Sequence, residues 1–521
     1  MNRPIRSSRE RNRVLSSPQL DFRPRAPRFF LHRLLVLLAI LTPLVMAACT
    51  AGVGARALDK LHPCTSSEGP TDAYCGTLTV FENRDTRHGR TLDLWIVVLP
   101  AGRPAVQDPL VFLAGGPGQG AAQLARQIRG AFRDIQRTRD IVLVDQRGTG
   151  KSHPLNCRSD ANSLREMTEP NDASLDRLKR CLAGYDADVR LYVTDIAMDD
   201  LDDVRAHLGY DTVNLYGGSY GTRAALVYLR RHGDHVRSMI LDGVAPTDMR
   251  LPLFTARDAQ RALDKLLTDC EAEPTCRRAF PELAARVRGL LKRLENDPPV
   301  VRVVHPRTGI AEDIRVEARV VASILFSALY SPMTASIVPS LVDQAERNEF
   351  QGLFALALAG EGADENMSVG MQLSVLCSED ASRVTADEVK HETEGTMFGS
   401  HLLGNQLKAC DVWPRGHVGH AYYEPVVSDI PALVLSGDLD PVTPPKWGET
   451  VVKHLRHGRH ITVPGTGHGV IGTPCGISLI EEFLDRASAD TLDTSCVKSV
   501  KRPPFFVTPA GPDPTQSGSS R

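Results

Sequence analysis

The stretch that decides the fold of this 521-residue chain is Val213-Asn214-Leu215-Tyr216-Gly217-Gly218-Ser219-Tyr220-Gly221. A run typical of a β-strand ends in a serine between glycines, and a helix-compatible run over residues 222–228 follows at once. A strand that turns directly into a helix leaves no room for extra Cβ atoms, so Gly217 and Gly221 permit a sharp bend that exposes the Ser219 hydroxyl. The pattern therefore predicts a strained turn that presents a nucleophile.

Two later loops offer the partners that a serine nucleophile needs, namely a histidine base and a carboxylate that orients it. A buried-strand pattern leads into a turn that carries Asp438 and Asp440, and a second short strand pattern leads into a loop that carries His468 between glycines. The order serine, acid, histidine, each after a strand, is the order of an α/β-hydrolase triad. We expect Ser219 as the nucleophile, His468 as the base and Asp440 as the acid, with Asp438 as the alternative acid.

A glycine-rich loop is expected to supply part of an oxyanion hole. The strand pattern of residues 109–113 leads into Ala114-Gly115-Gly116-Pro117-Gly118. In this fold the two donors are the backbone N–H after the serine and an N–H from the loop after an earlier strand. The sequence thus predicts the N–H groups of Gly116 and Tyr220 as the donors.

The order of the predicted elements indicates the fold class. Strand patterns alternate with helical patterns and then give way to helices, such as residues 319–329 and 333–345, before the sheet resumes near Ile430. We expect an α/β-hydrolase fold, with a doubly wound, mostly parallel sheet and an inserted, mainly helical cap. The predicted strands are 92–99, 110–113, 141–145, 213–216 and 236–242; the predicted parts are a core over 50–248, a cap over 249–424, the second part of the core over 425–500 and a disordered tail over 503–521.

A family resemblance rests on three motifs that occur in order. They are the Gly-Gly-Pro-Gly loop, the segment Asp145-Gln146-Arg147-Gly148-Thr149-Gly150-Lys151-Ser152 and the Gly-Gly-Ser-Tyr-Gly turn. Together they resemble the proline iminopeptidase and tripeptidyl aminopeptidase family of serine hydrolases, over roughly residues 75–500. Two features favour the secreted tripeptidyl aminopeptidase branch. One is Tyr220, where proline iminopeptidases usually have Trp, and the other is a cysteine-bearing C-terminal segment. Ala114 departs from the His that proline iminopeptidases carry there, and Asp145 and Arg147 are interpreted as structural.

The resemblance implies an exopeptidase that releases residues from the free N-terminus of peptides through an acyl-enzyme, without a cofactor. Family members hold the substrate amine with acidic side chains of the cap, and the candidates are Glu379 and Asp380, which could instead be a solvated helix end. The alternatives are a carboxylesterase or lipase on the same scaffold and, in another class, an inactive membrane-tethered binding module. Preferred side chains and oligomeric state are left open.

The N-terminus predicts export. Nine arginines lie in the first 33 residues, and an uncharged apolar run from Leu34 ends in Met46-Ala47-Ala48-Cys49. This run is shorter than the roughly 20 residues that span a bilayer, and its layout is that of a secretory signal. We expect residues 1–48 to be a lipoprotein-type signal and Cys49 to be the lipidated anchor of a bacterial envelope protein, with plain secretion as the alternative.

Cysteine number and charge agree with export. Apart from Cys49, ten cysteines remain, an even number that suggests a disulfide framework. Cysteine and histidine spacing gives no zinc motif, so no metal is expected. The formal net charge is −2, and without the arginine-rich arm the chain is acidic, which argues against nucleic-acid binding. The predicted local pairs are Cys64–Cys75, Cys157–Cys181, Cys270–Cys276, Cys377–Cys410 and Cys475–Cys496.

Overall fold

The computed structural model describes residues 57–102, 106–157, 164, 171–364, 367–508 and 511–513. The expected signal over residues 1–48 and the expected anchor Cys49 lie outside these residues. Residues 56–521 form one compact unit. Among the described helices, none is long and apolar enough to cross a membrane.

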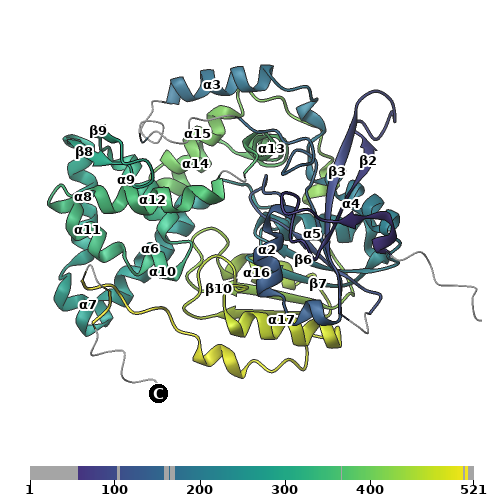
Figure 1. Cartoon of the computed structure of the whole chain (residues 1–521). Coiled ribbons are helices and arrows are strands. Elements are labelled where there is room, and N and C mark those ends of the chain that lie inside the picture. The colour runs from purple at the N-terminus through teal and green to yellow at the C-terminus, as the bar shows by residue number, and fades with distance from the viewer. Residues whose placement is uncertain are drawn as a thin grey trace, which may run out of the picture. The chain divides into compact units, whose positions relative to one another are not determined.

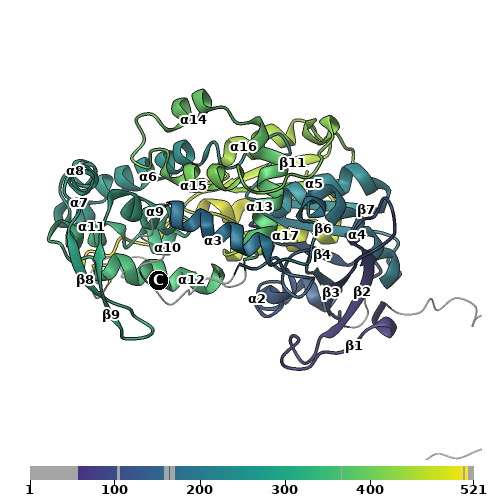
Figure 2. The ribbon, with the colours of Figure 1, turned by 90° about the horizontal axis from the view of Figure 1, so that it is seen from above.

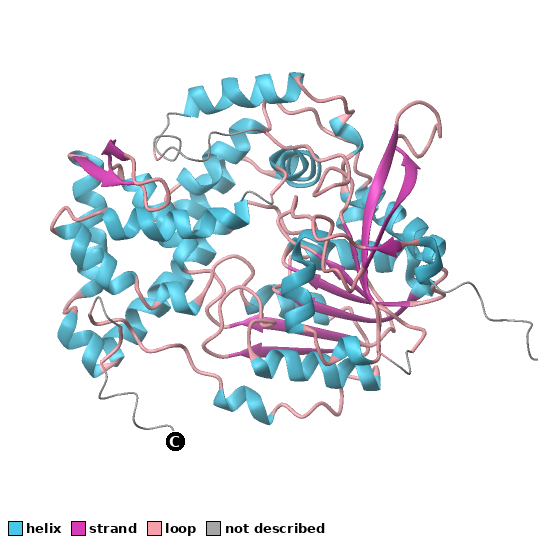
Figure 3. Ribbon diagram, in the orientation of Figure 1, coloured by secondary structure: helices cyan, strands magenta, loops and turns pink. Residues whose placement is uncertain are grey.

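A nine-stranded sheet forms the centre of the unit, in the order β1-β2-β3-β5-β4-β6-β7-β10-β11 (Figures 1 and 3). The pairs β1–β2, β2–β3 and β3–β5 are antiparallel, and all the others are parallel. The strands are β1 (His62–Pro63), β2 (Tyr74–Phe81), β3 (Thr91–Leu99), β4 (Leu110–Leu113), β5 (Ile141–Val144), β6 (Val213–Gly218), β7 (Val236–Asp242), β10 (Ala432–Gly437) and β11 (Gly458–Val463). The predicted strands are all present, whereas β2 was not predicted because Gly76 weakens the strand signal.

Helices cover both faces of the sheet, and the alternation of side chains along the strands divides its core in two. In β6, for example, Leu215 belongs to one apolar cluster and Tyr216 to the other. The first cluster includes residues of α4 (Thr194–Leu208), α5 (Tyr220–His232) and α16 (Pro445–Val452), and the second includes residues of α2 (Ala125–Ala131) and α17 (Pro474–Arg486). Because both faces are covered, the central strands β4 and β5 are continuously apolar and fully buried.

A second, mainly helical region lies beside the sheet and has an apolar core of its own (Figure 2). It contains one antiparallel hairpin, and one of its turns, η7, is a π-helix. Its elements are α6 (Thr255–Ala272), α7 (Pro274–Ala279), α8 (Leu283–Asn296), β8 (Val300–Val304), β9 (Ala311–Arg315), α9 (Ala318–Ala328), α10 (Pro332–Ala335), α11 (Val338–Glu346), α12 (Gln351–Asp364), α13 (Val369–Val375), η7 (Leu376–Asp380), α14 (Ala386–Thr393) and α15 (His401–Ala409). Of these, α13 and η7 contribute their buried apolar residues to the first cluster of the sheet. A further helix, α3 (Asn171–Ala183), precedes α4 in the chain.

Two predictions about this region need correction. The single helix expected over residues 333–345 is two helices, α10 and α11, because Pro339 fits only the first turn of a helix and here begins a new one. The disorder expected from Pro503 does not begin there. Phe505 is only 2% exposed and belongs to the apolar core of the helical region. The Phe506 N–H donates to the Ser336 carbonyl at 3.1 Å.

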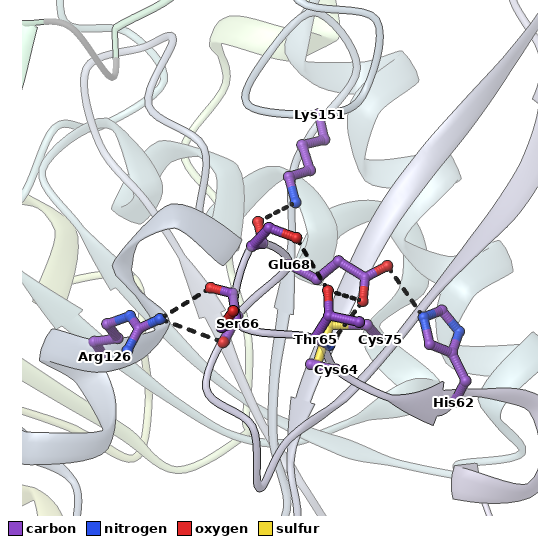
Figure 4. Close-up of a disulfide and its surroundings, with 10 residues drawn as sticks. His62, Cys64, Thr65, Ser66, Glu68, Cys75, Arg126 and Lys151 are labelled. Atoms are coloured by element: carbon purple, nitrogen blue, oxygen red, sulfur yellow. Dashed lines mark hydrogen bonds and ion pairs between the residues drawn. A yellow bond between two sulfur atoms is a disulfide. The ribbon is translucent and has the colours of Figure 1, made fainter.

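All five predicted cysteine pairs are disulfide bonded. Figure 4 shows the pair Cys64–Cys75, whose loop is tied to its neighbours by polar contacts. Lys151 Nζ donates to the Ser67 carbonyl at 3.1 Å, and Arg126 donates to the carbonyl of Ser66. Bridges of this kind stabilise mainly by restricting the unfolded chain, typically by about 2–4 kcal/mol each.

The segment around Asp145 and Arg147 has the structural role expected of it. The Asp145 carboxylate accepts the N–H groups of Ala122 and Lys151 at 2.8 and 2.9 Å, and burial raises its pKa to about 6. Arg147 is fully buried and donates through Nε to Asp200 at 2.6 Å. Both side chains therefore fix loop geometry.

Candidate active site

Ser219 occupies a strained turn between β6 and α5. Its φ of 56° and ψ of −126° lie in a region that L-residues rarely adopt. A Cβ at Gly217 would lie 2.2 Å from the Gly221 carbonyl oxygen, and one at Gly221 would lie 2.1 Å from the Leu113 carbonyl oxygen. The two glycines are thus required by close backbone contacts, as the sequence predicted.

The structure brings Asp440 and His468 together. Oδ2 of Asp440 lies 2.9 Å from Nδ1 of His468 and accepts the Thr443 hydroxyl at 2.8 Å, while Oδ1 accepts the N–H groups of Val442 and Thr443 at 2.8 Å each. The Asp440 carboxylate is fully buried. Among the described residues no hydrogen bond or ion pair joins Asp438 to His468, and the buried Oδ1 of Asp438 has no hydrogen-bond partner. Asp440 is therefore the acid that can orient the imidazole.

Asp242 joins the turn of Ser219 (the serine turn) to the loop of His468 after β11 (the histidine loop). The sequence patterns did not predict this role. Its backbone carbonyl accepts the Ser219 N–H at 2.9 Å, and its carboxylate accepts the N–H groups of Val470 and Ile471 at 2.8 to 3.0 Å. Burial raises the pKa of this carboxyl group. The partners of Asp242 lie far away in the chain, so no local pattern indicated them. The sequence showed only an acid at the end of a strand.

His468 packs against the helical region. The His468 ring meets the Tyr330 ring edge to face, with 5.1 Å between the ring centroids. The backbone N–H of His468 donates to the backbone carbonyl of Tyr330 at 2.8 Å. The His468 side chain keeps 15% exposure, so a reactant can reach it. Among the described residues no hydrogen bond to the Ser219 hydroxyl is present. Such catalytic contacts often tighten only when substrate binds.

The charges around His468 favour its protonated form. Burial alone would lower its pKa, but the adjacent Asp440 carboxylate and the more distant Asp242 raise it, and the net shift is upward. Burial of Asp440 is likewise outweighed by His468 and by the backbone N–H groups, and its pKa is lowered. An imidazole whose Nδ1 lies against an ionised carboxylate can accept a proton from a nearby hydroxyl group through Nε2.

Gly115 and Gly116, the two glycines of the predicted oxyanion loop, have different close neighbours. A Cβ at Gly115 would lie 3.0 Å from the Cβ of Ser219, whereas one at Gly116 would lie 2.8 Å from Sδ of Met367. Tyr220 follows Ser219 as the first residue of α5, where backbone N–H groups have no partner within the helix. The glycine loop and this helix end both border Ser219.

The structure corrects one of the two interpretations of Glu379 and Asp380. Glu379 is 0% exposed; its Oε1 accepts the Thr194 N–H at 2.7 Å and its Oε2 accepts the Tyr422 hydroxyl. Arg223 of α5 donates to Asp380 at 2.8 Å and lies 3.6 Å from Glu379. Both carboxylates are thus buried partners of Arg223, so the alternative of a solvated helix end is wrong, and binding of a substrate amine stays a prediction. Burial raises the pKa of Glu379 to about 7, against the opposing effect of Arg223.

Within the described residues, one group has donor atoms suited to a metal ion. These atoms of Asp202, His232 and His235 all lie within 4.8 Å of one another. However, Asp202 already accepts Arg205 Nε at 2.7 Å and the Tyr228 hydroxyl at 2.8 Å. The group is therefore described as an ion-pair network at the end of α5 opposite to Ser219.

The chain resembles several known proteins. Residues 108–274 match a family model described as alpha/beta hydrolase fold, and residues 395–496 match one described as TAP-like protein. The serine protease Hip1 of Mycobacterium tuberculosis is 28% identical over 489 residues, which cover 85% of this chain and 92% of that protein. A proline iminopeptidase of Neisseria gonorrhoeae is 31% identical over 26% of this chain and 32% of its own. The tripeptidyl aminopeptidase of Streptomyces lividans is 27% identical over 38% of this chain and 40% of its own.

The mostly parallel sheet and the serine turn, with an acid and a histidine after later strands, define an α/β-hydrolase. The motifs and the two matching family models narrow this class. The chain belongs to the α/β-hydrolase family of proline iminopeptidases and tripeptidyl aminopeptidases. It is a serine hydrolase with peptidase relatives.

The pH dependence of catalysis should follow His468. Only the neutral imidazole can act as a base, so activity rises as pH increases through the pKa of His468. Because this pKa is raised above the ordinary value of about 6.5, the acid limb of kcat/KM should have its midpoint above pH 6.5. In Asp440→Asn the midpoint should move to lower pH. An unchanged midpoint in that variant would contradict the assigned contact.

The buried position of Glu379 can be tested with Glu379→Gln. If Glu379 supports the fold, the variant should unfold at a lower temperature and should lose activity by similar factors on free-amine peptides and on small esters. If the carboxylate instead held a substrate amine, only the peptides would be affected, by about 2–5 kcal/mol in kcat/KM. Parallel kinetics on both substrate types distinguish the two, and a selective loss on the peptides would restore the amine anchor.

Proposed function

We propose that this chain is an exported serine exopeptidase that releases residues from the free N-terminus of peptides through an acyl-enzyme. The observation that carries the proposal is the 2.9 Å contact between Asp440 and His468 at the same sheet edge as the strained Ser219 turn. The peptidase names of the relatives support peptides as substrates. No cofactor is needed for this chemistry.

In the proposed mechanism the Ser219 hydroxyl attacks the carbonyl carbon of the scissile bond while His468 Nε2 accepts its proton. Asp440 holds Nδ1 of the imidazole and stabilises the imidazolium that forms. The oxyanion is bound by the Tyr220 N–H and by an N–H of the Gly115-Gly116 segment. His468 then protonates the leaving amine, and a water molecule, deprotonated by His468, releases the N-terminal portion from Ser219.

The helical region over residues 249–424 is proposed as a cap on this site. Tyr330 of this region contacts the ring of His468, and Met367 approaches the glycine loop. The Ser368 N–H also donates to the Gly118 carbonyl at 2.9 Å. A cap in this position would exclude water from the acyl-enzyme and shape the pocket for the N-terminal residues.

The proposal includes export. Five disulfides are typical of proteins that fold in an oxidising compartment. With the basic and apolar N-terminal segment they support delivery to the bacterial cell envelope. Anchoring through a lipid on Cys49 remains the preferred form, with plain secretion as the alternative.

An esterase is the second candidate, because the residues predicted to hold a substrate amine are occupied by Arg223. The triad and the oxyanion donors would serve an ester equally well. A free-amine preference would therefore need another anchor in the cap.

A substrate panel separates these functions. Free and N-acetylated peptide anilides of one to three residues are compared with short p-nitrophenyl esters, with Ser219→Ala as the blank. The proposal predicts cleavage of free-amine peptides and a loss of at least about tenfold in kcat/KM on acetylation, as for a lost charge pair. Equal cleavage of both peptide forms would refute the exopeptidase, and turnover of esters alone would establish the esterase.

A further inference from the structure

Arg261 of the helical region contacts the loop between β10 and α16 that carries Asp440, here called the acid loop. It belongs to α6, and its guanidinium donates to two backbone carbonyls of that loop, through Nη1 to Asp438 at 2.8 Å and through Nη2 to Asp440 at 2.6 Å. Its Nε is buried without a hydrogen-bond partner among the described residues. A charged, forked donor on two carbonyl groups fixes both the position and the orientation of the loop.

The same side of α6 continues this polar contact. Lys265 and Asp269 follow Arg261 at spacings of four residues, which place them on one helix face. Asp269 lies 3.1 Å from Lys265 Nζ and accepts Arg502 Nη1 at 2.8 Å. Lys265 also acts on Asp438, whose pKa is raised by burial against the effect of this lysine. The helix thus meets the acid loop through charged and polar groups.

The acid loop has contacts of its own and one to the histidine loop, where the Leu439 N–H donates to the Thr466 carbonyl at 3.0 Å, and Arg261 adds a contact from the helical region. The N–H groups of Val442 and Thr443 and the Thr443 hydroxyl bind the Asp440 carboxylate, so they fix the side chain relative to its own loop. His468 belongs to a different loop. Its backbone N–H donates to the Tyr330 carbonyl of the helical region. Arg261 and Tyr330 therefore connect the acid loop and the histidine loop to one region.

We propose that Arg261 is a positioning residue that holds the acid loop so that Asp440 stays against Nδ1 of His468. The proposal rests on the catalytic roles proposed above for Asp440 and His468. Lysine at this position would keep the charge but offer a single nitrogen in place of the two that bind the loop, and methionine would offer no donor. Because a displacement of about 1 Å can cost up to about 100-fold in rate, a modest shift of the loop is enough to affect catalysis.

The proposal has a consequence for pH that general destabilisation would not produce. His468 faces two carboxylates, Asp440 from the acid loop and Asp242 from the end of β7, together with the Thr443 hydroxyl and the Tyr330 ring. If the acid loop moves away, the influence of Asp440 weakens while that of Asp242 remains. The acid limb of kcat/KM should then move to lower pH.

The experiment compares Arg261→Lys and Arg261→Met with the control Arg257→Met in the full-length protein. Arg257 lies one turn earlier on α6 and pairs with Glu392 at 2.7 Å and Asp258 at 3.1 Å, outside the acid loop. We expect Arg261→Met to lower kcat by about 10- to 100-fold with little change in KM and to shift the acid limb. Arg261→Lys should be intermediate, and Arg257→Met should change neither kcat nor the limb.

A double variant separates this inference from the proposed function. If Arg261 acts through Asp440, Asp440→Asn with Arg261→Met should be no slower than Asp440→Asn alone. Additive losses, or an Arg261→Lys enzyme with normal kcat and an unshifted limb, would overturn the positioning role. If Asp440→Asn by itself keeps full activity, the proposed triad fails instead. Thermal unfolding of each variant identifies those that fold. If Arg261→Met does not fold, the kinetics of Arg261→Lys test the positioning role.

Discussion

The close backbone contact at the serine turn is the constraint on which the rest of the site depends. Gly217 and Gly221 bring the start of α5 against β6 and the Leu113 carbonyl, and this contact keeps Ser219 at a positive φ. Asp242 then extends the constraint to the next strand, since its carbonyl binds the Ser219 N–H and its carboxylate binds the histidine loop. One strand end thus holds both the serine turn and the histidine loop in place, and the strain at Ser219 is supported by several hydrogen bonds.

Arginine side chains connect this site to the helical region in two places. Behind the serine, Arg223 of α5 pairs with the acids of η7, and its burial makes that pairing obligatory because an unpaired buried charge is very costly. Beside the acid, Arg261 of α6 binds carbonyls of the loop that carries Asp440. Helix α5 and the acid loop therefore both depend on residues that lie far away in the chain, and the proposed cap is a part of the catalytic support.

The sequence alone predicted what local patterns encode. The serine turn, the strand ends with Asp440 and His468, and the five local cysteine pairs were correct because each depends on neighbouring residues or on a fixed order of loops. The buried pairing of Glu379 was not predicted because its partners Arg223 and Thr194 lie more than 150 residues away, so its charge looked free. The contacts of Asp242 and Arg261 were missed because their partners also lie far away in the chain. The assignment of the Gly116 N–H to the oxyanion hole stays a prediction.

The central claim is that the Ser219 hydroxyl is an activated nucleophile, and covalent labelling tests it directly. A fluorophosphonate probe is incubated with the folded protein, and the modified residue is located by mass spectrometry of peptides, with Ser219→Ala as the control. We predict a single adduct on Ser219, complete loss of hydrolytic activity on labelling, and no adduct in the variant. Hydrolysis that persists in Ser219→Ala, or an adduct on another residue that abolishes activity, would contradict the account.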